Sequence, residues 1–325
     1  MQKAIIITSI FEPTEAVKAF AQLPDYQLIV VGDQKSPENW DCNGAKFIPV
    51  NEQMELNFNL IKVLPFNHYS RKMIGYLIAI QQGADYIIDT DDDNIPLENW
   101  EFPGFNGKFD AIEENQQFVN IYQLFTDQKI WPRGLPLHLI NKQYSFTDII
   151  STRECEVGIW QGLADEDPDV DAIYRLTSDK PCYFNQRNPI VLLNGTVCPF
   201  NTQNTIIRKE LFPLLYLPTY VTFRFTDILR GLVAQPIMWL YNYTLGFTKA
   251  TVIQKRNPHD YMKDFISEIP MYEQGEKVIK IVSNAISADK CITENLYEAY
   301  KALSTNGIVT ERELVTLEAW IKDLN

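Results

Sequence analysis

The sequence lacks an apolar run of the roughly 18 residues that a membrane-spanning helix needs, and its N-terminus has no small-residue cleavage pattern of a signal peptide. Its five cysteines include no C-x-x-C pair and favour free thiols in a reducing compartment. Lys and Arg (29) are outnumbered by Asp and Glu (42), and the net charge of -13 argues against nucleic acid as a partner. We therefore expect a cytoplasmic protein with no integral membrane segment.

The 325 residues, of which 46% are hydrophobic, can build a sizeable core. The first 95 residues alternate between β-rich runs (3–10, 27–33, 45–50 and 85–89) and amphipathic segments, one beginning at Thr14 and one spanning 68–82. This rhythm predicts an α/β fold with a mixed, mostly parallel sheet flanked by helices. Ligands bind beyond the carboxyl ends of such strands, so Ser9, Asp33 and residues 89–94 should converge on one crevice.

The rest of the chain divides into two parts. Residues 101–257 are rich in Pro, Asn and aromatics, and we expect long loops and short strands that complete a domain of residues 1–268. Residues 269–325 show helical periodicity, with a capping box expected at Thr310 and Glu313. This C-terminal helical appendage could pack on the domain or form a homo-oligomer.

The run "DTDDDN" (89–94) puts four carboxylates into six positions behind an apolar strand. An EF-hand is excluded because Asn94 and Trp100 stand where Gly and Glu are required. A solvated turn is the alternative, but carboxylates this close repel unless a cation neutralises them. We therefore predict Mn²⁺ or Mg²⁺ on Asp91 and Asp93. Asp89 would orient its neighbours, and Asp92 would face Arg71 or a sugar hydroxyl.

A metal held by carboxylates and phosphate oxygens suits a transferase that uses a nucleotide-diphosphate sugar. Seven motifs between residues 5 and 262 support this interpretation: "VVGDQKSPENW", "LPFNHYSRKMIGYLIAIQQGADYIIDTDDDN", "IWPRGLPL", "DPDVDAIYRLT", "CPFNTQNT", "DILRG" and "QKRNPHD". They resemble the motifs of the STELLO glycosyltransferase-like proteins and, more distantly, those of the reversibly glycosylated polypeptides, the UDP-arabinopyranose mutases. The resemblance implies a GT-A fold, a nucleotide-diphosphate sugar donor, with a UDP-sugar favoured, and a divalent cation.

The resemblance and the residue chemistry together indicate which residues would bind the nucleotide-sugar donor. Asp33 would contact the base or ribose, although it could simply initiate a turn. Arg71 and Lys72 open a helix before the acid strand and could reach the diphosphate, or they could lie on a solvated face. Lys255 and Arg256 would pair with the phosphates. By family resemblance, His259 would be a further metal ligand rather than a structural histidine. Candidate donor contacts also include Ser9, Asp92, Asp169 and Asn204.

Two acids are candidate catalytic residues. Asp227 in "RFTDILRG" lies on a predicted helix, where it could serve as the base for an inverting transfer or stabilise the sugar in a retaining one. The alternative is an ion pair with Arg224 or Arg230. Asp171, like Asp169, would contact sugar hydroxyls, unless the segment is only an exposed acidic loop.

The leading hypothesis is a metal-dependent glycosyltransferase with a glycan, lipid or protein acceptor. A nucleotide-sugar mutase and a catalytically silent nucleotide-sugar-binding protein are the alternatives.

Overall fold

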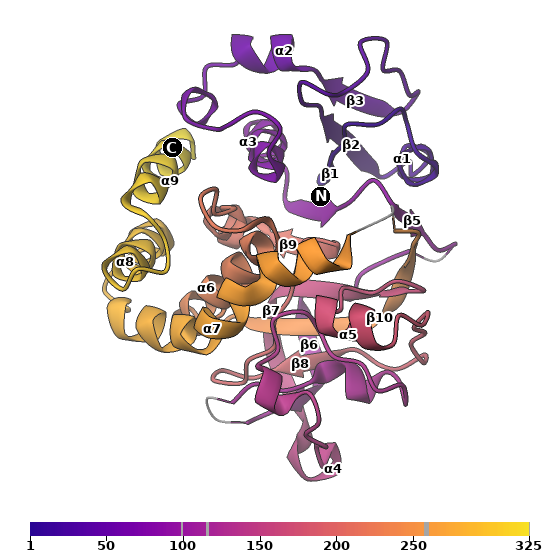
Figure 1. Ribbon diagram of the computed structural model, residues 1–325, viewed down its shortest axis with the longest axis vertical. Helices are drawn as coiled ribbons and strands as arrows, with labels where there is room; N and C mark the ends of the chain where they lie inside the picture. The colour runs from indigo at the N-terminus through magenta and orange to yellow at the C-terminus, as the bar shows by residue number, and fades with distance from the viewer. Residues whose placement is uncertain (99, 115–116, 257–259, 325) are drawn as a thin grey trace.

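The computed structural model describes residues 1–98, 100–114, 117–256 and 260–324. Over these residues ten strands form one mixed sheet with helices packed on it (Figure 1). The strand order is β3-β2-β1-β4-β9-β7-β6-β8-β10-β5. The strands are β1 Lys3–Thr8, β2 Tyr26–Val31, β3 Ala45–Ile48, β4 Tyr86–Thr90, β5 Asn94–Pro96, β6 Asn106–Ile112, β7 Ile150–Asp165, β8 Ile190–Leu192, β9 Asn204–Arg208 and β10 Thr244–Gln254.

The helices follow the strands in the N-terminal part and dominate the C-terminal part of the chain. The α-helices are α1 Glu15–Phe20, α2 Val50–Glu55, α3 Lys72–Gln81, α4 Phe146–Ile149, α5 Ala172–Thr177, α6 Thr226–Leu240, α7 Tyr261–Ala285, α8 Ile292–Thr305 and α9 Glu311–Asp323. Three short 3₁₀ helices matter for the site: η1 Leu60–Lys62, η2 Tyr69–Arg71 and η6 Phe223–Phe225. None of the described helices has the length and apolarity to cross a membrane.

The N-terminal part confirms the predicted alternation of strands and helices. β3, β2, β1 and β4 are parallel neighbours, so their carboxyl ends share one edge. Thr14 caps α1 by accepting a hydrogen bond from Val17 N. Gly83 has φ +83° directly after α3, as a C-terminal stop requires. Gly75 sits where a Cβ would lie 2.6 Å from Ile6 Cγ2, so its small size lets α3 approach β1 closely.

The middle part differs from the expectation of short strands. β7 has 16 residues and β10 has 11, and the two pair in parallel through several register shifts. Residues of β7 between Val157 and Ala164 are buried on both faces, so the segment shows no polar–apolar alternation. β9 runs antiparallel to β4 and joins this part to the four parallel strands. The mixed sheet is therefore confirmed, but it is not mostly parallel: the described pairings are five parallel and five antiparallel.

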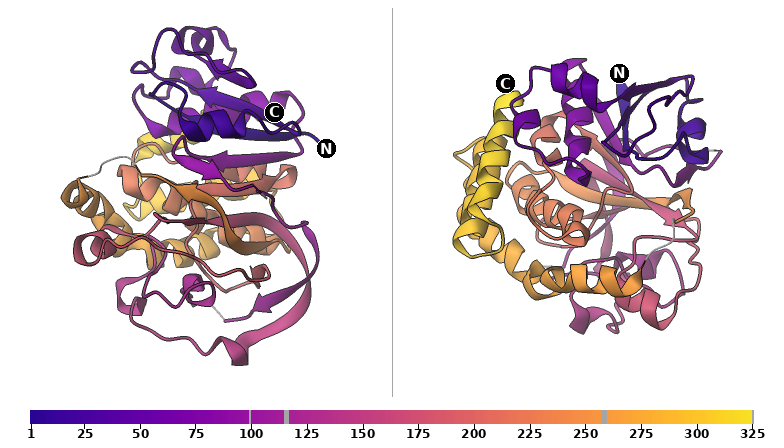
Figure 2. Two further views of the ribbon diagram at one scale, coloured as in Figure 1. Left: turned by 90° about the vertical axis from the view of Figure 1, so that its right-hand side faces the viewer. Right: turned by 45° about the horizontal axis from the view of Figure 1, so that its top comes forward.

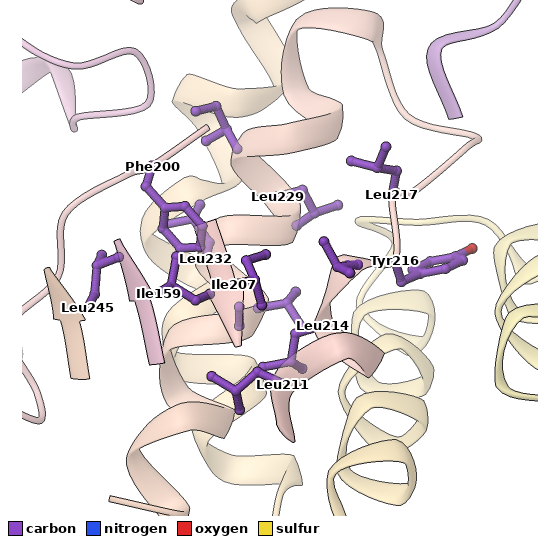
Figure 3. Close-up of a cluster of buried hydrophobic side chains, with 14 of the residues drawn as sticks. Ile159, Phe200, Ile207, Leu211, Leu214, Tyr216, Leu217, Leu229, Leu232 and Leu245 are labelled. Carbon is purple, nitrogen blue, oxygen red and sulfur yellow. The ribbon is translucent and has the colours of Figure 1, made fainter. Parts of the chain in front are cut away.

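The largest core lies between the sheet and α6. Figure 3 shows Ile159 of β7, Ile207 of β9 and Leu245 of β10 facing Leu229 and Leu232 of α6. All five side chains are at most 1% exposed. Burying a side chain of this size stabilises the fold by about 1.5–3 kcal/mol. This packing fixes α6, which carries Asp227, against the strands.

The C-terminal helices pack on the rest of the chain, with α7 against α6, α8 against α7 and α9 against α8 (Figure 2). Asp323 at the end of α9 accepts hydrogen bonds from Asn59 N, Asn59 Nδ2 and Leu60 N, and so ties α9 to η1. The predicted division at residues 268/269 falls inside α7.

The expected capping box is wrong. Thr310 occupies the N-cap position of α9 without a side-chain bond. Glu313 is instead buried, where it accepts from Tyr216 Oη, Thr219 N and Tyr220 N. Three donors in the loop before η6 offer this carboxylate more than the single N–H at the helix start.

Candidate functional site

The acid run follows β4, which ends at Thr90, so Asp91, Asp92 and Asp93 lie in the turn before β5. We call residues 89–93 the acid turn. Ser9 follows β1 and Asp33 follows β2 at the same edge of the sheet. Because these strands are parallel neighbours, their ends converge, and Ser9 Oγ donates to Asp92 Oδ2 at 2.5 Å. The structure therefore brings together the groups that the strand pattern predicted would meet.

Asp89 is the buried anchor of the acid turn. Its carboxylate is 2.6 Å from Lys72 Nζ and 2.7 Å from Arg230 Nη1, and it accepts a hydrogen bond from Tyr76 Oη. All four side chains are at most 2% exposed. Two cations and a hydroxyl donor offset the cost of burying this carboxylate. Asp89 therefore holds β4, α3 and α6 together beneath the turn.

The next three carboxylates face solvent to different degrees. Asp91 Oδ1 accepts from Tyr69 Oη at 3.0 Å and pairs with Lys72 Nζ at 3.1 Å. Asp92 faces Ser9, rather than the expected Arg71. Asp93 Oδ2 accepts from Gln254 Nε2, and its Oδ1 is buried without a hydrogen-bond partner in the described structure.

The acid turn carries more negative charge than its neighbours neutralise. Among the described residues, Lys72 and Arg230 are the cations that pair directly with the turn, so its four acid groups outnumber the paired cations by two; Arg256 acts on Asp93 from a greater distance. Burial, and then the charge of Asp91, raise the pKa of Asp93 to about 7. Burial also raises the pKa of Asp92. No three described His, Cys, Asp or Glu side chains gather as a metal site on their own.

A divalent cation fits this donor set in two respects. A cation would compensate the acid groups that outnumber the paired cations, and it could supply the bond that Oδ1 of Asp93 lacks among the described residues. Mg²⁺ and Mn²⁺ take oxygen ligands, and Mg²⁺ commonly uses only one or two carboxylates when phosphate oxygens complete its shell. Asp91 and Asp93 are therefore suited to the metal that the sequence predicts. His259, the third predicted ligand, lies outside the described residues.

A second group of acids, which we call the arginine cluster, is fully paired. Arg133 bridges Asp169 at 2.8 Å and Asp227 at 2.7 Å. Arg224 pairs with Glu268 of α7 at 2.9 Å. Its described members are five carboxylates and four guanidinium groups: Asp167, Asp169, Asp179, Asp227 and Glu268, with Arg133, Arg175, Arg224 and Arg256.

Ion pairing sets the charge state of Asp169. Burial would raise the pKa of Asp169, but the guanidiniums of Arg133 and Arg224 outweigh it and lower the pKa to about 2. Asn201 Nδ2 donates to the same carboxylate at 2.8 Å. Asp169 is therefore an ionised carboxylate with fixed orientation.

Two contiguous pockets open between the acid turn and the arginine cluster. The large pocket encloses about 330 Å³ and is lined by Thr8, Ser9, Ile10, Phe11, Asp33, Lys35, Asn67, His68, Tyr69, Asp91, Asp92, Asp93, Phe223, Arg224, Gln254 and Arg256. The small pocket encloses about 90 Å³ and is lined by Tyr69, Asp91, Arg133, Asp169, Asn201, Thr202, Gln203, Phe223, Arg224, Asp227, Gln254 and Arg256. Asp91 and Arg256 border both, so one elongated ligand could bind across them.

Eight of the predicted site residues line these pockets: Ser9, Asp33, Asp91, Asp92, Asp93, Asp169, Asp227 and Arg256. Asp33 is held in place by bonds from Gln34 N and His68 N. Arg256 lines both pockets with its Nη1 buried and without a hydrogen-bond partner among the described residues. It is the guanidinium best placed to receive an anion from a ligand.

Five other predicted residues lie away from both pockets. Arg71 is buried and donates to Gln53 Oε1. Lys72 forms ion pairs with Asp89 and Asp91. Asn204 is paired inside the sheet with Trp100 and Thr251. Lys255 is exposed, 3.6 Å from Glu15.

Asp171 is the fifth, and it is fully buried. It caps α5 by accepting from Tyr174 N, and its other oxygen accepts from Trp131 Nε1. Burial raises its pKa to about 6. This geometry favours a structural role over the predicted catalytic one.

Several pocket residues were not predicted, among them Arg133, Tyr69 and Thr202. Arg133 lies in the quoted motif "IWPRGLPL", whose Pro-Arg-Gly centre was the available signal, although it named no partner. The ion pair considered between Asp227 and Arg224 or Arg230 is replaced by one with Arg133. Arg230 reaches Asp89 instead.

The chain is thus an α/β protein whose sheet edge combines an acid turn, two pockets and an arginine cluster. The family model described as STELLO glycosyltransferases matches residues 224–325. Two Arabidopsis thaliana proteins, the probable glycosyltransferases STELLO1 and STELLO2, are each 28% identical to it, over 347 and 345 residues. The alignments cover 99% of this chain and 44% of each relative, so the chain spans less than half their length. The resemblance to the STELLO family is therefore confirmed.

Two solved structures are similar at a lower level. Glucosyl-3-phosphoglycerate synthase from Mycobacterium tuberculosis matches with a TM-score of 0.42 and 9% identity, covering 88% of this chain and 81% of that one. A structure described as a mycobacterial protein matches with a TM-score of 0.41 and 11% identity, covering 88% and 75%. Likeness at this level carries no functional argument.

Proposed function

We propose that the chain is a metal-dependent glycosyltransferase that moves a sugar from a nucleotide-diphosphate sugar, with a UDP-sugar favoured, to an acceptor. The similarity to probable glycosyltransferases over 99% of the chain supports the reaction class. The observation that carries the proposal is that the acid groups of the acid turn outnumber the cations paired with them, beside pockets lined by Arg224 and Arg256. A diphosphate with a divalent cation fits both surfaces, because the cation would bind the carboxylates of the acid turn and the phosphates would bind the two arginines.

The donor would lie along both pockets. The large pocket has the volume of a typical ligand site, and its wall combines Phe11 with the fixed carboxylate of Asp33, which suits a base and ribose. The diphosphate would lie near Arg256, whose Nη1 has no hydrogen-bond partner among the described residues. The sugar would enter the small pocket, where Asp169, Asn201 and Asp227 present oxygens and amide groups to hydroxyls.

Asp91 and Asp93 would hold the metal. When bound, Mg²⁺ or Mn²⁺ supplies Lewis-acid stabilisation of the charge on the leaving nucleotide. Arg133 binds both Asp169 and Asp227, but the side chain of Asp227 is the more exposed, at 11% against 7%, and would therefore face the acceptor in the small pocket. It could accept the proton of an acceptor hydroxyl in an inverting transfer or stabilise the sugar in a retaining one.

A panel of UDP- and GDP-sugars tests the proposal. The protein is incubated with each donor and Mn²⁺, with and without EDTA, and the products are separated by chromatography. Metal-dependent release of free nucleotide supports transfer or slow hydrolysis. A rearranged sugar that stays attached to its nucleotide supports a mutase instead, and tight binding without turnover supports a silent binder. If no nucleoside diphosphate binds, the proposal is wrong.

Variants locate the activity on the acid turn. Asp91→Asn and Asp93→Asn should each lower metal-dependent turnover about 100-fold, the scale seen when one electrostatic contact to a transition state is lost. Asp25→Asn changes an exposed aspartate before β2 and is the matched control. Equal losses in all three variants would contradict the assignment.

A further inference from the structure

Glu268 of α7 lines neither pocket, yet it binds a residue that lines both. Its Oε1 accepts from Arg224 Nε at 3.0 Å and lies 2.9 Å from Arg224 Nη2. Its Oε2 accepts from Ala172 N at 2.8 Å and from Tyr272 Oη at 2.6 Å. The carboxylate is completely buried, and each oxygen is bound to two donors. It therefore has one orientation, fixed jointly by α5, α7 and η6.

Arg224 depends on Glu268 for its position. The other nearby acid, Asp169, is 3.8 Å from Arg224 Nη2 and is already bound by Arg133 and Asn201. Glu268 instead contacts two nitrogens of Arg224, Nε and Nη2, through the single oxygen Oε1, and this charge-assisted contact restricts the orientation of the guanidinium. This leaves the remaining edge of Arg224 as part of the wall shared by both pockets.

We propose that Glu268 is a positioning residue that orients Arg224 for the diphosphate of the donor, so that α7 is part of the binding site. The inference rests on the proposed function, because it assumes that a nucleoside diphosphate occupies the two pockets. An arginine held in place before binding loses less side-chain entropy when it contacts an anion. The binding energy of Arg224 therefore depends on a residue 44 positions further along the chain.

The chain offers a matched control in Glu313 of α9. It is also completely buried, and it accepts from Tyr216 Oη, Thr219 N and Tyr220 N. None of these partners lines either pocket. In both positions, Glu→Gln would turn an amide NH₂ toward a backbone or guanidinium N–H and leave a donor unpaired. The two substitutions disturb folding in the same way, and one of them also disturbs the pocket.

Titration calorimetry with UDP and Mn²⁺ tests the inference on the wild-type chain and on Glu268→Gln, Glu313→Gln, Arg224→Gln and the Arg224→Gln/Glu268→Gln double variant. Glu268→Gln should weaken UDP binding about 10-fold, the size of one charge-assisted contact. Glu313→Gln should bind UDP within about twofold of wild type, while its melting temperature falls as it does for Glu268→Gln. In the Arg224→Gln background, Glu268→Gln should add less than about twofold, because its effect passes through Arg224.

The inference is overturned if Glu268→Gln binds UDP as wild type does, if Glu313→Gln weakens binding equally, or if the Glu268→Gln effect persists without Arg224. Should Glu268→Gln fail to fold, Tyr272→Phe removes one donor from the same carboxylate and should weaken UDP binding about twofold, again only when Arg224 is present. Wild-type protein that binds no nucleoside diphosphate overturns the proposed function together with this inference. Normal wild-type binding with an unaffected Glu268→Gln variant overturns the inference alone.

Discussion

The acid turn and the arginine cluster face each other across the same pockets. They differ in how far the charges of their carboxylates are compensated by neighbouring cations. In the described structure, two of the four carboxylates of the turn pair with two cations, whereas all five carboxylates of the cluster pair with its four guanidiniums. Correspondingly, the pKa of Asp93 is raised to about 7 by burial and by Asp91, and the pKa of Asp169 is lowered to about 2 against burial by Arg133. Burial acts in the same direction on both acids, and the neighbouring arginines of Asp169 reverse its effect there.

The largest expected effect comes from removing the central cation of the cluster. Arg133→Gln leaves Asp169 and Asp227 buried without their shared partner, which should lower the free energy of unfolding by about 3–5 kcal/mol. Urea unfolding measures the loss. Lys209→Gln is the control, because its ion pair with Asp85 is exposed and should contribute less than about 1 kcal/mol. Similar losses in the two variants would show that the cluster is not a buried ion-pair network.

The reverse outcome is expected in the acid turn. Asp93→Asn removes a carboxylate that is buried beside the like charge of Asp91. In EDTA, the melting temperature of the variant should therefore equal or exceed that of wild type. Added Mn²⁺ should raise the melting temperature of wild type by mass action and have little effect on the variant. Thermal unfolding in EDTA and in Mn²⁺ gives both values. A full Mn²⁺ shift in Asp93→Asn would place the metal elsewhere.

Asp171 tests whether an acid that lies near the arginine cluster in the sequence also has a lowered pKa. It lies two residues from Asp169 but has no arginine partner in the described structure, and burial raises its pKa to about 6. Because this pKa exceeds the unfolded value near 3.9, the folded protein binds the extra proton, and the stability contribution of Asp171 is lost as pH rises from about 4 to 6.

Relative to Asp171→Asn, wild type should therefore lose about 2–3 kcal/mol of unfolding free energy between pH 4 and pH 7. Urea unfolding of both proteins across this range measures the difference, and the constant cost of placing an amide beside Trp131 Nε1 cancels. A difference that does not change with pH would show that Asp171 has an ordinary pKa.

The smallest expected effect on stability comes from loosening the packing of α3, the helix that places Lys72 beside the acid turn. Gly75→Ala places a Cβ about 2.6 Å from Ile6 Cγ2 and 2.8 Å from Val31 Cγ2, which pushes α3 away from the sheet. Overpacking of this kind costs about 1–3 kcal/mol. Thermal unfolding should show the loss, and Ala79→Gly, which loosens the same helix without a clash, should cost about 1 kcal/mol. A Gly75→Ala protein as stable as wild type would mean that α3 has room to move.

Sequence patterns predicted the parts of the site that depend on local order. Ser9, Asp33 and the acid turn follow from strands that end in polar residues at one edge of a parallel sheet. The ion-pair partners of the acids could not be predicted from the sequence patterns. Asp227 meets Arg133 across 94 positions and Asp89 meets Arg230 across 141, and neither separation leaves a periodic signal.

Neighbouring residues also proved a poor guide to shared roles. Arg71 and Lys72 are adjacent, but one contacts Gln53 and the other the acid turn. Asp169 and Asp171 are two residues apart, but only Asp169 lines a pocket. Chain direction and packing separate these pairs, and both depend on tertiary contacts that sequence spacing does not encode.

The bonds from Asp323 to Asn59 and Leu60 have a consequence for how the chain acquires its fold. They join residues 264 and 263 positions apart. During synthesis at about 5–20 residues per second, η1 leaves the ribosome tens of seconds before its partner in α9. The N-terminal strands must therefore wait with this contact unmade, and contacts between such distant residues slow folding. We therefore expect the docking of α9 on η1 to be a late step of folding.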